Sequence, residues 1–199
     1  QMKKITLMAA MLVTMTASVF AQQNWKLDGA HSKIRFTTKY LLISDVDGEF
    51  KKFDVTANSS AADWSDLKVT ASVDVNSITT DNEQRDGHLK GDDFFNAEKY
   101  PKMTFTSTGI KSLGNKKYSL TGQLTIRDVT KTVTLPLVYG GTVTDPWGNI
   151  KAGFKATGSI NRQEYGLKWS NKAATGEAVV SDDVDFTIDL ILIKDVPKQ

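Results

Sequence analysis

The sequence of 199 residues contains no cysteine, two histidines and four prolines. Without cysteine the chain forms no disulfide and has no thiol nucleophile or site for a cysteine-linked lipid, so its core must be stable through packing alone. It also lacks a G-x-S-x-G turn, a glycine-rich phosphate loop and an H-E-x-x-H pair, which are short signatures of many enzymes. We therefore expect no catalytic residue set, no metal and no cofactor, and interpret the protein as a non-enzyme.

An excess of charge of one sign is also lacking. Lysine and arginine number 25, and aspartate and glutamate number 23. Lys3 and Lys4 belong to the N-terminal segment described next, and the rest of the chain carries 23 charges of each sign. Nucleic acids and anionic membrane surfaces attract proteins with a clear positive excess. We therefore expect no nucleic-acid partner and no stable membrane anchor.

The first 21 residues have the three-part pattern of an export signal. Met2-Lys3-Lys4 is positively charged, an uncharged and mostly apolar run follows over residues 5–19, and Val19-Phe20-Ala21 suits a signal peptidase. The run is too short, and has the wrong flanks, to span a membrane. We predict that residues 1–21 are a signal peptide, with Gln1 as a leading remnant, and that residues 22–199 form one periplasmic domain.

Most of the chain after Gln22 alternates between apolar and polar residues. The alternation is clearest in residues 33–40, 68–75, 117–126, 133–139 and 184–192. A period of two is typical of strands with one buried and one solvated face. Segment 81–91 instead has the caps and residue types of a short helix, and segment 92–97 suggests a second helical turn.

Both a sandwich and a barrel satisfy this pattern, and two details favour a barrel. The strands are long for a small sandwich, and the small residues Ala71, Gly122, Ala156 and Gly158 fall on apolar faces. Small inward residues leave room inside a barrel, although Gly122 and Gly158 could equally mark bends. We predict an all-β fold, an eight-stranded antiparallel barrel with one or two short helices, wide enough for a small ligand.

The histidines are the first candidates for chemistry. If His31 and His88 met over Asp86, Asp92 or Asp93, they would form a metal or acid–base site. The pattern shows no paired-ligand spacing, so structural hydrogen bonds at a strand end and a helix end are the favoured interpretation.

Two arginines and two tryptophans are further candidates. An arginine at the mouth of an apolar barrel can bind a phosphate or carboxylate. For Arg127 we favour a pair with Asp128 or exposure to water, whereas for Arg162 the structural and functional interpretations stay open. Trp147 and Trp169 fit strand alternation poorly, and we expect each to line an entrance or to be partly exposed.

Several blocks in order along the chain carry a resemblance to a known family. They are Asp28 with His31-Ser32 and Phe36, Gly48-Glu49-Phe50, Ser77-Ile78-Thr79-Thr80, Arg85-Asp86-Gly87-His88-Leu89, Asp93-Phe94-Phe95, Tyr100-Pro101-Lys102-Met103-Thr104-Phe105, Gly122-Gln123-Leu124-Thr125-Ile126, Val129-Thr130-Lys131 and Asn161-Arg162-Gln163-Glu164-Tyr165-Gly166-Leu167. From Trp25 to about Leu192 the chain resembles the YceI-like family of exported, lipocalin-like polyisoprenoid-binding proteins. The resemblance implies a barrel around an apolar pore that binds a long isoprenoid or similar amphiphile without a known reaction.

Two positions depart from the family pattern. Relatives often have a histidine in a Lys/Arg-His-Leu context where this chain has Lys39-Tyr40-Leu41, and Asn96 stands where aspartate is common. These changes bear on how a ligand headgroup is held and not on the fold.

We predict that inward aromatic and aliphatic residues line the pore. They are Phe36, Tyr40, Phe50, Phe105, Leu124, Leu135, Phe154, Trp169 and Phe186, with His31 and Arg162 as candidate headgroup contacts. The expected ligand is a polyprenyl phosphate, a quinone or a fatty acid. The alternatives are an enzyme that acts on a lipid or quinone through His31 and His88, and a stress-related protein-interaction barrel without ligand. A homodimer is left open.

The signal-peptide prediction has a direct test. When the full sequence is expressed in a bacterium with an outer membrane, we expect the protein in the periplasmic fraction to begin at Gln22. N-terminal mass spectrometry of that fraction measures the cleavage site. A protein that retains Met2 and stays in the cytoplasm would contradict the prediction.

Overall fold

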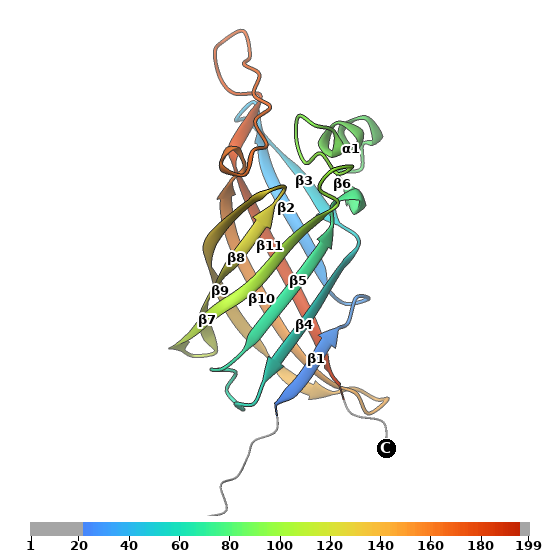
Figure 1. The fold of residues 1–199 in the computed structure, drawn as a ribbon, viewed down its shortest axis with the longest axis vertical. Helices are drawn as coiled ribbons and strands as arrows, with labels where there is room; N and C mark the ends of the chain where they lie inside the picture. The colour runs from blue at the N-terminus through green and yellow to red at the C-terminus, as the bar shows by residue number, and fades with distance from the viewer. Residues whose placement is uncertain (1–21, 196–199) are drawn as a thin grey trace, which may run out of the picture.

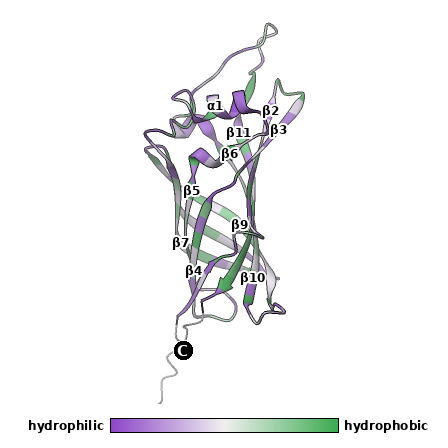
Figure 2. Cartoon of the chain, turned by 90° about the vertical axis from the view of Figure 1, so that its right-hand side faces the viewer, coloured by the Kyte–Doolittle hydropathy of each residue, from purple (hydrophilic) through white to green (hydrophobic). Residues whose placement is uncertain are grey.

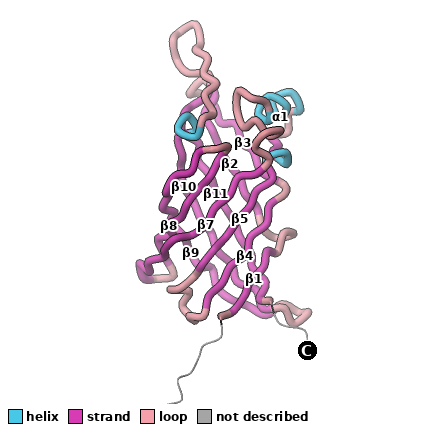
Figure 3. The backbone as a smooth tube through the Cα atoms, viewed as in Figure 1, coloured by secondary structure: helices cyan, strands magenta, loops and turns pink. Residues whose placement is uncertain are grey.

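The structure is a computed structural model that describes residues 22–195, so the predicted signal peptide lies outside the described residues. Its strands are β1 (Gln23–Leu27), β2 (Lys33–Tyr40), β3 (Ser44–Phe50), β4 (Phe53–Ser59), β5 (Lys68–Asp74), β6 (Ile78–Thr79), β7 (Lys102–Gly114), β8 (Lys117–Ile126), β9 (Val129–Thr144), β10 (Ile150–Asn161) and β11 (Val180–Lys194). The helical segments are η1 (Val75–Ser77), α1 (Glu83–Lys90) and η2 (Arg162–Tyr165). Figure 3 shows that they lie at one end of the molecule, which we call the upper end, as in Figure 1.

The strands form a closed antiparallel barrel and not a sandwich. Hydrogen bonding runs in the order β1, β4, β5, β7, β8, β9, β10 and β11, and β11 pairs back with β1, which closes a ring of eight strands. Figure 1 shows the resulting elongated barrel. The prediction of an eight-stranded antiparallel barrel is confirmed. Within the part of the chain that the structure describes, no helix is long and apolar enough to cross a bilayer.

One position in the barrel wall is occupied by two strands in succession. β1 pairs with the end of β11, through Leu192–Lys194, and β2 pairs with the earlier part of the same strand. β1 and β2 are therefore two halves of one broken strand. β3 and β4 repeat this arrangement, because β3 pairs with β2 and β4 pairs with β1.

The break between β1 and β2 is closed by side-chain hydrogen bonds. The Ile191 amide of β11 donates to the Ser32 hydroxyl at 2.9 Å, and that hydroxyl donates to the Asp28 carbonyl at 2.8 Å. The Asp28 amide in turn donates to the Ile191 carbonyl at 2.8 Å. The backbone groups of β11 thus keep partners where the neighbouring strand is interrupted, as buried backbone groups require.

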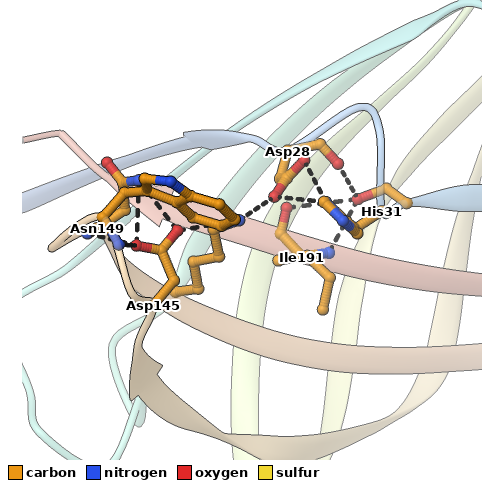
Figure 4. Close-up of polar contacts among 8 residues, drawn as sticks. Asp28, His31, Asp145, Asn149 and Ile191 are labelled. Carbon is orange, nitrogen blue, oxygen red and sulfur yellow. Dashed lines mark hydrogen bonds and ion pairs between the residues drawn. The ribbon is translucent and has the colours of Figure 1, made fainter.

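The Asp28 carboxylate forms the centre of a polar cluster at this break (Figure 4). It accepts from Lys151 Nζ at 2.8 Å and lies 3.0 Å from His31 Nδ1, and Lys151 Nζ also lies 3.4 Å from Asp145. Burial alone would raise the pKa of Asp28, but the hydrogen bonds from Lys151 and His31 outweigh it and lower that pKa. The hydrogen bond to Asp28 raises the pKa of Lys151.

The lower half of the barrel is filled by aromatic residues. Trp64, from the loop after β4, has its ring 4.9 Å from that of Trp25 and 5.0 Å from that of Phe154. The hydroxyl of Tyr118 donates to the carbonyl of Asp63, which fixes the loop inside the barrel end. This packing closes the lower end.

The helix lies close to where the sequence predicts it. The side chain of Asn82 caps α1 by accepting from the Arg85 amide at 2.9 Å, one residue later than the predicted start at Asp81. None of the residues of α1 is buried. The second predicted helical segment, residues 92–97, forms turns instead, and two of its own residues, Phe94 and Ala97, are buried. A turn is favoured there because Asn96 has a left-handed backbone (φ 48°), which a helix excludes.

We expect Asp28→Ala to lower the free energy of unfolding by about 2–3 kcal/mol at neutral pH, because it leaves Lys151 without its main partner. The folded-state pKa of Asp28 is lowered, so its contribution is present above the ordinary aspartate pKa of about 4 and is lost as pH falls through the folded-state value. The gap between the variant and the unchanged protein should therefore shrink in acid. Urea unfolding over a pH series measures it.

Asp189→Ala is the matched control, because Asp189 makes only surface ion pairs with Arg35 and Lys155. Exposed pairs contribute at most about 1 kcal/mol. Equal losses in the two variants would show that the Asp28 cluster does not stabilise the break.

Candidate ligand-binding cavity

A cavity of about 250 Å³ lies inside the barrel above the aromatic cluster. Its wall is built from inward-facing residues of the strands and from the loops that cover the upper end, and the surface that faces the cavity is entirely apolar. This follows from strand alternation, because every second residue of each strand points inward and these positions carry aliphatic or aromatic side chains.

Most of the residues that the sequence proposes for the pore lie on this wall. They are Phe36, Phe50, Phe105, Leu124, Leu135, Phe154 and Phe186. They come from seven strands, β2, β3, β7, β8, β9, β10 and β11, so the structure brings together residues from all parts of the sequence.

Tyr40 and Trp169 are not on the wall. Thr38 is the last residue of β2 that lines the cavity, and the Tyr40 side chain, two residues further, is 44% exposed because β2 continues beyond the rim. The Trp169 ring packs against the covering loops, with its centroid 5.7 Å from that of Phe94 and 5.5 Å from that of His88.

The loops at the upper end add wall residues that alternation does not predict. Leu89 of α1 and the consecutive Phe94 and Phe95 reach the cavity, and the Phe95 ring meets that of Phe50 edge to face at 5.9 Å. The available signal is the pair of phenylalanines between Asp93 and Asn96, since two large apolar residues in a polar turn need a buried surface.

Two of the four small inward residues leave open space and two do not. Ala71 and Ala156 line the cavity. A Cβ atom on Gly158 would lie 2.4 Å from Cζ of Phe186, and one on Gly122 would lie 2.4 Å from Cζ of Phe105. Each phenylalanine ring therefore lies over a glycine of the neighbouring strand, an arrangement known from other sheets.

The Arg162 guanidinium is fully occupied by the protein itself. Its side chain is only 4% exposed. Its five N–H groups donate, at 2.7 to 3.4 Å, to the backbone carbonyls of Ser181, Leu167, Trp169 and Val180 and to the carboxylate of Asp182. Burial lowers the pKa of Arg162, against the opposing effect of Asp182. An arginine has five donors, so none is left for a ligand, and Arg162 reaches the cavity only through apolar atoms.

Arg127 also has a structural position, as the sequence favoured, but it neither pairs with Asp128 nor extends into water: its side chain is 17% exposed. Its Nη1 donates to the carbonyl of Phe94 at 3.0 Å and to that of Gly166 at 2.8 Å. It thereby ties the turn after α1 to the end of η2. Asp128 instead accepts from the Tyr100 hydroxyl at 3.2 Å.

The two histidines occupy different sites. His31 bonds Asp28 in the polar cluster, whereas His88 Nε2 lies 3.0 Å from Asp93 at the upper end. The segment between β1 and β2 and helix α1 are well separated in Figure 1. Asp86 accepts from the amide and hydroxyl of Thr80. Between residues 22 and 195 no group of three or more histidine, cysteine or acidic side chains is arranged to bind a metal.

The barrel and its apolar interior define a lipocalin-like binding fold. The chain belongs to the YceI-like family, whose domain matches residues 25–192. A UPF0312 protein of Staphylococcus aureus (strain USA300) is 38% identical over 164 residues, which cover 82% of this chain and 93% of the relative. The family resemblance is confirmed.

Solved structures share the fold. BcnA of Burkholderia cenocepacia has a TM-score of 0.73 at 26% identity, covering 83% of this chain and 98% of that one. A YceI protein of Campylobacter jejuni has a TM-score of 0.68 at 32% identity, covering 79% and 90%. A polyisoprenoid binding domain from Saccharophagus degradans has a TM-score of 0.62 at 17% identity, covering 86% and 98%.

We expect Arg162→Lys to lower the free energy of unfolding by about 2–4 kcal/mol, because an ammonium has three donors and leaves buried carbonyls without partners. Urea unfolding measures the loss. Arg35→Lys is the control, since Arg35 forms an exposed pair with Asp189, and it should change stability by less than about 1 kcal/mol. An Arg162→Lys variant with unchanged stability and weakened ligand binding would instead assign Arg162 to a headgroup.

Proposed function

We propose that this protein binds the apolar chain of an isoprenoid or a similar amphiphile and holds or carries it in the periplasm. The observation that supports this proposal is the cavity inside the barrel, whose wall presents only apolar atoms. A polar or charged substrate would give up its hydrogen bonds to water there without gaining a partner. A hydrocarbon chain makes no such hydrogen bonds, so its burial carries no such cost.

The energy of such binding comes from the chain itself. Each methylene transferred from water to an apolar environment gains about 0.8 kcal/mol. A long tail therefore binds tightly without an ion pair, which is consistent with an Arg162 whose donors are all used within the protein.

The headgroup of the ligand is proposed to lie at or beyond the upper rim. His31 belongs to the cluster around Asp28 and Lys151, and we do not assign it a ligand contact. A polyprenyl phosphate and a quinone with an isoprenoid tail suit this arrangement equally. A fatty acid serves as the unbranched ligand with which they are compared. The polyisoprenoid binding domain of Saccharophagus degradans is a neighbour in fold and makes the isoprenoid tail the first class to test.

Catalysis on a lipid or quinone has less support. That hypothesis needs His31 and His88 beside one pocket, and the structure places them with different aspartates in different parts of the barrel.

We expect Ala156→Leu to weaken binding of a long-chain polyprenol by about tenfold, because the larger side chain takes space within the cavity. Native mass spectrometry and fluorescence titration measure the occupancy. Palmitic acid offered in parallel compares an unbranched chain with a polyprenyl one.

Thr157→Leu is the matched control, because Thr157 is the next residue of β10 and faces outward. It should bind like the unchanged protein. If the unchanged protein takes up neither lipid, or if both variants bind equally well, the cavity is not the binding site and a protein-interaction role becomes the better hypothesis.

A further inference from the structure

The turn between β2 and β3 exposes large apolar side chains at the upper rim. Leu42 is 56% exposed and Ile43 is 83% exposed. Tyr40, at the end of β2, is 44% exposed beside them. We call residues 41–43 the rim turn. Figure 2 shows that the hairpin of β2 and β3 reaches the upper end of the barrel.

The rim turn combines this exposure with an unfavourable backbone. Leu41 and Leu42 have left-handed backbone angles, with φ of 51° and 60°, and the Ile43 amide closes the turn onto the Tyr40 carbonyl at 3.1 Å. Glycine and asparagine suit such positions, whereas a leucine with its bulky side chain costs free energy there. Two leucines in this geometry are therefore poor choices for folding alone, and they point to a role outside the fold.

The rim turn lies beside the upper end of the cavity, which the loops around Phe94 and Phe95 cover. Thr38 and Val180 line the cavity, Val180 pairs with Tyr40, and the Leu41 amide donates to the Val179 carbonyl at 2.9 Å. The lower end is filled by the aromatic cluster around Trp64. A chain that enters or leaves the barrel through an end must therefore pass the rim that carries this turn.

We propose that the rim turn inserts into the acyl region of a lipid bilayer and places the upper end of the barrel against the membrane. The cargo that would then pass between membrane and cavity rests on the proposed function, but the docking of the turn can be measured without any cargo.

The size of the rim turn argues for a bilayer and against a protein partner. A stable protein interface buries about 800 Å² on each side, far more than a turn of three residues can supply. Insertion into hydrocarbon needs no complementary surface, and a few apolar side chains suffice for brief, reversible binding.

The charges beside the rim turn indicate whether its binding to a bilayer requires anionic lipid. Lys39 Nζ lies 2.6 Å from Asp45 on the neighbouring strand, so the flanking cation is paired. The rim turn thus brings no net charge, and its attraction to a membrane must come from apolar burial. Such binding does not require anionic lipid and is insensitive to salt.

The test compares the unchanged protein with the double variant Leu42→Asn and Ile43→Thr in flotation with phosphatidylcholine vesicles. Asparagine tolerates the left-handed backbone, so thermal unfolding should confirm an intact fold. We expect the vesicle-bound fraction, and the rate of polyprenol transfer from donor vesicles, to fall about tenfold. Binding of polyprenol added from solution should be unchanged.

Trp147→Ala is the matched control, because Trp147 is 82% exposed in the turn between β9 and β10, at the lower end. It should float like the unchanged protein. The proposal is overturned if the unchanged protein does not bind vesicles, if Trp147→Ala loses as much binding as the double variant, or if binding requires anionic phosphatidylglycerol. It is also overturned if analytical sedimentation shows that the unchanged protein is a dimer and the double variant is a monomer.

The two proposals fail in different ways. Vesicle binding that depends on the rim turn, in a protein that takes up no polyprenol from solution, supports docking and contradicts the carrier function. Polyprenol uptake from solution with no vesicle binding contradicts docking alone.

Discussion

The structure depends on how β11 closes the barrel. Along one edge this strand pairs first with β2 and then, near its end, with β1. The wall can bend between the two because Ser32 supplies the hydrogen bonds that a continuous strand would have made. The Asp28 carboxylate then joins the break to Lys151 of β10, so that three neighbouring wall segments are fixed at one point. A barrel wall around a cavity benefits from such local fixing, because the atoms that face the cavity lack packing partners.

The cavity lies between two packed hydrophobic clusters, both of which contribute to its wall. An unfilled cavity costs stability because the atoms around it lack partners. The aromatic cluster around Trp64 supplies dense packing in the lower half. In the upper half, the rings of Phe105 and Phe186 lie over glycines of the neighbouring strand, so they cover the wall and leave the space inside open. The loop residues Phe94 and Phe95 cover the upper end.

The parts of the fold that could be predicted are those decided by neighbouring residues. Alternation along a strand assigns Phe36, Phe105 and Phe186 to the interior, because the direction of a strand side chain depends only on its parity. The same rule fails at Tyr40, since parity does not reveal where the barrel ends. Long, regular strands make the barrel itself predictable in the same way.

The rest of the candidate site depends on contacts between distant parts of the chain. Asp28 and Lys151 are in contact although they lie 123 positions apart in the sequence. No local sequence pattern predicts that contact. The role of Arg162 is decided by carbonyls of the segment after η2, and that of Arg127 by the turn after α1. In both cases the arginine is visible in the sequence, but most of its partners are backbone carbonyls, which carry no sequence signature.

An interior without hydrogen-bonding groups also gives a bound chain no fixed register. Neighbouring positions along an apolar tube provide nearly equal contacts, so a chain can slide lengthwise by one methylene at little cost. Tails that differ in length or in the position of a branch would occupy the same space with similar ease. If the proposed lipid-binding function holds, protein isolated from cells would carry a mixture of related lipids, and the composition of that mixture would follow the lipids available more than any selection by the barrel.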